Sequence, residues 1–150
     1  MLVIIKNNLI VCAIHIGVTI IMFFPHAYIY RIGGPFQGIS DTIQTLIMIV
    51  FAFIIYFVLG KFLLAKTENV LWSILSVSML FIIITLIGIF AYNTLGRLAN
   101  LPFFPSIWGI QGFYNFLRGK YFDELYEKII YIVIAALPSL AMWLGLFSKK

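Results

Sequence analysis

Four long apolar stretches dominate the chain, and turn-forming or charged residues separate them. At about 1.5 Å per residue, a helix of roughly 20 residues crosses the hydrocarbon core of a bilayer. We therefore predict transmembrane helices at residues 9–27, 43–64, 70–92 and 129–147. The first apolar run is the shortest, so its helix should be completed either by residues 3–5 or by continuing past Pro25.

The two earlier connections differ in length and in character. Residues 31–42 are rich in glycine and proline and indicate an irregular loop. Residues 65–69 leave room only for a tight turn, so the helices before and after it should be antiparallel neighbours.

The third connection, residues 93–128, stays apolar and aromatic instead of turning polar. After Pro102 and Pro105, residues 106–118 are predicted to form a short helix that lies flat in the membrane interface. The predicted fold is thus an all-α membrane protein, a single domain over residues 1–150. It consists of four transmembrane helices in an antiparallel bundle plus this short interfacial helix.

Composition supports the membrane interpretation, because 63% of residues are hydrophobic and only 10% are charged. Ordinary soluble domains are about half apolar and a quarter charged. The ten basic residues outnumber five acidic ones, but they stand singly near span ends, where lipid headgroups rather than nucleic acid are the expected partners. The one cysteine, Cys12, allows no internal disulfide and no thiol-pair redox chemistry.

An even number of spans places both termini on one side of the membrane. Basic residues divide equally between the sides: Lys6, Lys61, Lys66, Lys149 and Lys150 on the terminal side, and Arg31, Arg97, Arg118, Lys120 and Lys128 on the other. The terminal side has them in short flanks and a tight hairpin, where the positive-inside rule acts most strongly. We predict a multi-pass cell-membrane protein with cytoplasmic termini.

His15 is the first candidate for a functional residue, because an ionisable side chain in the middle of a span is costly without a partner. Cys12 and Thr19 share its helix face, so His15 and Thr19 form a candidate binding pair. The favoured interpretation is a neutral imidazole that is hydrogen-bonded to a neighbouring helix. No metal site is expected, since His26 lies about three helical turns away.

Basic residues beyond the third span make a second candidate site. Arg97, with Asn93 and Asn100 at helical spacing, could bind a lipid phosphate together with Arg118 and Lys120. The alternative is that these side chains are interface anchors whose stems lie in lipid.

Small residues recur at helix-face spacing within three spans and predict close contacts between helices of the bundle. They are Ala13 with Gly17, Ser78 with Thr85 and Gly88, and Ala135 with Ser139. An oligomer contact is the alternative for any one of these groups.

The spans contain no Asp or Glu, and the chain shows no cysteine pair, metal cluster or nucleophile triad. We therefore expect a small non-enzymatic membrane protein without a cofactor, which acts through helix and lipid contacts. It would be an accessory subunit of a membrane complex or an immunity-type protein, in contact with other membrane chains or a second copy. Two alternatives stay open: a transport component with a pathway near His15, and a lipid-modifying enzyme that uses Arg97, Arg118 and His26.

Overall fold

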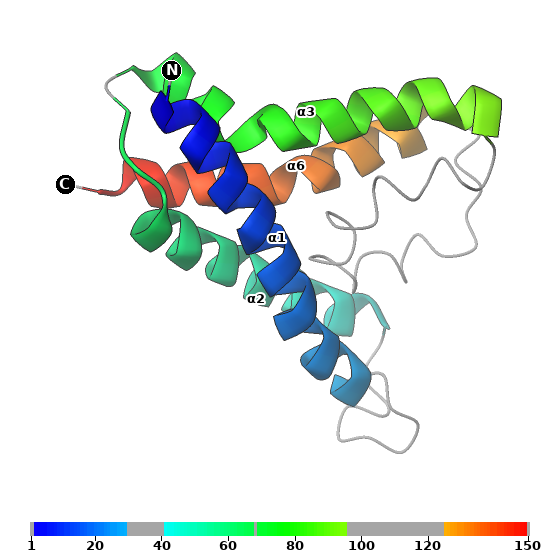
Figure 1. Cartoon of the computed structure of the whole chain (residues 1–150). Coiled ribbons are helices and arrows are strands. Elements are labelled where there is room, and N and C mark those ends of the chain that lie inside the picture. Colours follow the sequence, from blue (N-terminus) through cyan, green and yellow to red (C-terminus); the bar gives the residue numbers. More distant parts are fainter. Residues whose placement is uncertain (1, 30–40, 68, 96–124, 150) are drawn as a thin grey trace.

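The computed structural model describes residues 2–29, 41–67, 69–95 and 125–149. These form four long helices and no strand, so the all-α prediction is confirmed for this part of the chain. In chain order the helices are α1 (Leu2–Ile29), α2 (Asp41–Leu63), α3 (Val70–Leu95) and α6 (Leu125–Phe147) (Figure 1).

The helices match the predicted spans closely at some ends and extend beyond them at others. α2 and α3 begin within two residues of the predicted starts, whereas α1 begins at Leu2 instead of residue 9. α1 also continues through Pro25 to Ile29. The early start brings Asn7 into the helix, and its polar side chain is buried against other parts of the chain.

α6 lies between α2 and α3 and packs against both, while α1 crosses the group and contacts α2 and α3 (Figure 1). The predicted neighbour relation of α2 and α3 is wrong. Within the described residues these consecutive helices make little or no direct contact, although a short connection joins them. The reason is that α6 occupies the position beside α2 that α3 was expected to take.

Both ends of the described chain lie at the same end of the molecule (Figure 1). Asn7 of α1 is hydrogen-bonded to Ala65, and Lys149, which follows α6, is hydrogen-bonded to Leu64. The start of α1, the α2–α3 connection and the end of α6 therefore meet here. We call this the basic end, defined by Lys6, Lys61, Lys66 and Lys149.

Two of the helices contain stretches that are long and apolar enough to cross a membrane, Leu2–Met22 and Leu46–Leu63. Shorter apolar helical stretches cover Val70–Met79 and Ala136–Phe147. Large apolar side chains on all four helices are exposed, as Phe24 at 69% and Phe62 at 73% illustrate. The buried core is a narrower set: Val11, Ile14, Val18, Met22, Met48, Ala52, Tyr56, Leu64, Val77, Ala141, Met142 and Leu146.

Candidate functional site: buried polar contacts between helices

A buried polar contact joins His15 of α1 to Tyr56 of α2. The Nδ1 atom of His15 lies 2.9 Å from the Tyr56 hydroxyl oxygen, and either group donates according to the histidine tautomer. Both side chains are buried, and their ring centroids are 5.2 Å apart. The predicted hydrogen bond between His15 and a neighbouring helix is thus confirmed.

Of the other two members of the predicted His15 face, only Cys12 has a described side chain. Cys12 is half-buried, and the side chain of Thr19 lies outside what the structure describes. Tyr56 is the partner that sequence reasoning missed. Its signal was available, since a phenol in the middle of an apolar helix needs a hydrogen-bond partner when it is buried.

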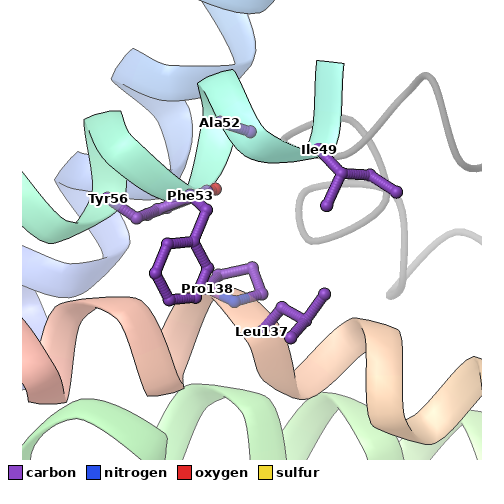
Figure 2. A pocket seen from close by; sticks show the side chains of 6 residues that line it. All are labelled: Ile49, Ala52, Phe53, Tyr56, Leu137 and Pro138. Carbon is purple, nitrogen blue, oxygen red and sulfur yellow. The ribbon is translucent and has the colours of Figure 1, made fainter. Parts of the chain in front are cut away.

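A small cavity lies beside Tyr56, between α2 and α6 (Figure 2). Its lining consists of Ile49, Ala52, Phe53 and Tyr56 from α2 with Leu137 and Pro138 from α6. Figure 2 shows the Phe53 ring directed from α2 toward Pro138. The cavity volume is about 10 Å³, close to that of a single water-sized sphere, so this space does not hold a substrate.

Asn7 forms a second polar contact, at the basic end, and sequence reasoning did not single it out. Its Nδ2 donates to the Ala65 carbonyl oxygen at 2.8 Å, and its Oδ1 accepts from the Ala65 amide at 2.9 Å. Nδ2 also lies 3.3 Å from the Ser76 hydroxyl oxygen of α3. One fully buried amide therefore pairs with both backbone polar groups of Ala65, in the α2–α3 connection, and holds α1 to that connection.

The neighbouring Asn8 is satisfied less completely. Its Nδ2 donates to the Ile4 carbonyl at 2.9 Å and to the Leu75 carbonyl at 3.3 Å. Its Oδ1 is buried and has no hydrogen-bond partner. The two adjacent asparagines are thus unequal, and Asn7 makes the stronger connection.

The lysines of the basic end are held partly by backbone oxygens. Lys149 donates through Nζ to the Leu64 carbonyl, and Lys66 Nζ donates to the Lys149 carbonyl at 3.1 Å. Lys6, Lys61 and Lys66 are exposed. In the part of the chain that the structure describes, none of these amines forms a salt bridge with a carboxylate.

Two glycines that the spacing did not single out bring α2 and α6 together. A Cβ added to Gly60 would lie 2.6 Å from the Cα and carbonyl oxygen of Met142, and one added to Gly145 would lie 2.2 Å from the Phe57 carbonyl oxygen. α2 and α6 therefore approach to backbone contact at two reciprocal glycines. This close approach explains why α6, rather than α3, is the neighbour of α2.

The predicted pair Ala13 and Gly17 is wrong as an internal contact. Ala13 is exposed, and a Cβ added to Gly17 would meet nothing within 4 Å. Ser139 does lie at an internal contact, because its buried hydroxyl donates to the Val77 carbonyl oxygen of α3 at 3.1 Å. Of the other predicted small residues, Ser78 donates through its hydroxyl to the Ile74 carbonyl oxygen of its own helix at 2.8 Å. The side chains of Thr85 and Ala135 lie outside the described set, as does Gly88.

The second predicted site lies beyond the described residues. Arg97, Arg118, Lys120 and the predicted interfacial helix at residues 106–118 all fall there, and so does the side chain of His26. Within the described residues, no group of three or more His, Cys, Asp or Glu side chains is placed to hold a metal ion.

Comparison with known proteins gives no relative from which a role could be transferred. No protein-family model, no curated protein and no solved structure matches the chain significantly. A functional proposal therefore depends on the residues of this chain alone.

Proposed function

We propose that the protein is a four-span integral membrane protein without enzymatic activity, which works by helix contacts with another membrane chain. An accessory subunit and an immunity-type protein are the two forms of this role. The observation that carries the proposal is the distribution of polarity: apolar side chains face outward, and buried polar side chains are bonded between helices.

The outward apolar surface supports a lipid environment. A core helix of a soluble protein is mostly buried, but only 29% of the Leu2–Met22 stretch and 22% of the Leu46–Leu63 stretch are buried. α3 and α6 extend the same surface, with Leu71 exposed at 60% and Val133 at 57%. Apolar surface on this scale is unfavourable in water and favourable against lipid tails.

The inward polar contacts support the same environment. In lipid, a polar side chain must find its partner within protein, and small polar residues commonly hydrogen-bond across helices. The His15–Tyr56 contact joins α1 to α2, and the Ser139–Val77 contact joins α6 to α3. Asn7 adds a bond from α1 to the α2–α3 connection.

The outward face of α1 is the surface on which we place the partner. Ala13 and Gly17 are one turn apart, and the space beside Gly17 is open. Small residues at this spacing let a second helix approach to backbone contact, which is how helices associate where lipid gives no hydrophobic drive. Ile20, exposed at 60%, continues this face by nearly one turn.

Affinity purification after gentle detergent extraction tests the proposal. The wild-type chain should retain a membrane partner or a second copy, and Gly17→Leu should lose it because the added side chain blocks the contact. Gly17→Leu should leave the isolated chain intact, because a Cβ added there would meet no other part of the described chain within 4 Å.

Val58→Leu is the matched control, since it adds bulk to an exposed position on α2 and should retain the partner. Purification of the wild-type chain alone, as a stable monomer, would contradict the proposal. Loss of the partner from both variants would contradict the placement of the contact on α1.

A further inference from the structure

We propose that the small cavity between α2 and α6 binds one ordered water molecule, which links the Tyr56 hydroxyl to the main-chain carbonyl of Ile134. Together with the contact between His15 and Tyr56, this water completes a polar chain that runs from α1 through α2 to α6. The inference goes beyond the proposed function, because it concerns the inside of the helix group and does not depend on a partner chain.

Pro138 leaves one carbonyl group of α6 without its usual donor. Pro138 lies inside the helix, and proline has no N–H to donate to the carbonyl of the residue four positions earlier, Ile134. In transmembrane helices, ordered water is one of the groups that satisfy a carbonyl freed in this way. The proline ring is crowded against that carbonyl, and Pro138 is buried and lines the cavity. The cavity therefore lies beside a carbonyl that needs a donor.

Tyr56 supplies a second partner for the water, from the opposite wall of the cavity. In the described structure its hydroxyl has one hydrogen bond, with His15 Nδ1 at 2.9 Å. A phenol hydroxyl both donates and accepts, so with either histidine tautomer it has capacity for a second bond. Figure 2 shows the Tyr56 side chain extending along α2 toward Ala52 and Phe53, which line the same cavity.

The size of the cavity fits one water molecule and no larger ligand. Its volume of about 10 Å³ is close to the smallest that admits a water. Because apolar cavities stay dry, a buried water also needs polar partners, about two to four of them. The Tyr56 hydroxyl and the Ile134 carbonyl provide two, and they come from different helices.

NMR spectroscopy of the purified full-length chain in detergent micelles tests whether the water is bound. With alanine labelled by ¹³C in the methyl group, Ala52 should show a cross peak with water. Ala141, which is buried but does not line the cavity, should show none.

Two variants identify the partners of the water. Tyr56→Phe should abolish the Ala52 cross peak because it removes the hydroxyl. Pro138→Ala should abolish it because the new N–H takes the Ile134 carbonyl. Pro138→Ala keeps the Tyr56 hydroxyl proton, so its effect distinguishes a bound water from magnetisation relayed through that hydroxyl.

A matched pair of variants at Ala52 gives an independent readout. Valine and threonine side chains have nearly the same shape, but only threonine carries a hydroxyl. Either side chain would enter the cavity and displace the water. The hydroxyl from Ala52→Thr can take over bonds of the water, so this variant should unfold at a higher denaturant concentration than Ala52→Val. At the exposed position Val58 of the same helix, Val58→Thr should not raise the unfolding midpoint.

Absence of the Ala52 cross peak, or its persistence in Pro138→Ala, would overturn the inference. A higher unfolding midpoint for Ala52→Val than for Ala52→Thr would overturn it as well, because it would show a dry, apolar cavity. All of these readouts use the isolated chain. They are therefore separable from failure of the proposed function, which would appear as purification without a partner.

Discussion

At the scale of single residues, the His15–Tyr56 contact shows how a polar group is accommodated among apolar helices. Hydrogen bonds between membrane helices are worth about 0.6 kcal/mol on average and up to about 1.7 kcal/mol. Tyr56→Phe removes the hydroxyl that lies 2.9 Å from His15 Nδ1 while keeping the ring in place. We expect the free energy of unfolding to fall by about 0.5–2 kcal/mol, measured by denaturant titration in detergent micelles.

A double-mutant cycle separates this hydrogen bond from the packing of the two rings. His15→Phe and the double variant with Tyr56→Phe complete the cycle, and the double variant should be less destabilised than the two single effects added together. Strict additivity would show that the contact contributes nothing to stability.

Asn7 and Asn8 offer a comparison within one helical turn. Asn7→Ala removes a fully buried amide and leaves the Ala65 amide and carbonyl without their partner. An unsatisfied buried backbone group costs about 1–3 kcal/mol, so Asn7→Ala should destabilise the chain by at least that amount. Asn8→Ala should cost less than about 1 kcal/mol, because it also removes an acceptor that has no partner. Equal losses of stability would contradict this assignment.

The sequence predicted that His15 needs a partner but not which residue supplies it. The pairing follows from the positions of the two residues along their helices. His15 lies about two turns beyond Asn7 on α1, and Tyr56 lies about two and a half turns before Ala65. The Asn7–Ala65 bond therefore sets a register in which the two side chains reach the same level. That register is a tertiary contact, and neither helix encodes it alone.

At the scale of helices, the reciprocal glycines make the sharpest prediction. Gly60→Ala and Gly145→Ala would each place a Cβ within 2.6 Å of backbone atoms of the facing helix, and backbone cannot rotate away as a side chain can. Each should lower the free energy of unfolding by about 1–3 kcal/mol or more. The readout is the same denaturant titration in micelles.

Gly17→Ala is the control for intrinsic helix preference. Alanine is favoured over glycine inside a helix by about 0.5–1 kcal/mol, and nothing lies within 4 Å of position 17. This variant should therefore be neutral or slightly stabilising. A loss of stability at Gly17 as large as that at Gly60 would contradict the α2–α6 contact described above.

Sequence analysis placed Ala13 and Gly17 wrongly and did not single out Gly60 and Gly145, for a physical reason. In an amphipathic helix the apolar stripe marks the packed face, but helices that are apolar on every side carry no such mark. Ala13 and Gly17 have the same four-residue spacing as Ala141 and Gly145, yet the first pair faces outward and the second pair is buried, while Gly60 faces inward without a small residue at that spacing. Residue size shows where close approach is possible, and only the packed structure shows where it occurs.

At the scale of the whole molecule, local sequence determines where the helices form, whereas long-range packing determines how they are arranged. The length of each apolar run was enough to predict the four helices, because backbone hydrogen bonds within a run do not depend on its neighbours. The way in which the described helices pack against one another was not predictable in the same way. A short connection between α2 and α3 restricts only their ends, and α6 occupies the space between them.

The proposed topology makes one prediction for the molecule as a whole. The basic end gathers the start of α1, the α2–α3 connection and the end of α6, so all three should lie on one side of the membrane, the cytoplasmic side. In a Cys12→Ser background, Lys66→Cys and Ser148→Cys should both resist a membrane-impermeant maleimide applied to intact cells. Both should react in inverted vesicles.

Asp41→Cys, at the first residue of α2, provides the opposite pattern, because one helix length separates it from the basic end. At about 1.5 Å per residue, the 23 residues of α2 span roughly 34 Å, enough to cross the hydrocarbon core. This cysteine should react in intact cells. Labelling of positions 66 and 148 from opposite sides would contradict the even-span topology, because the contacts of Lys66, Leu64 and Lys149 cannot form across a bilayer.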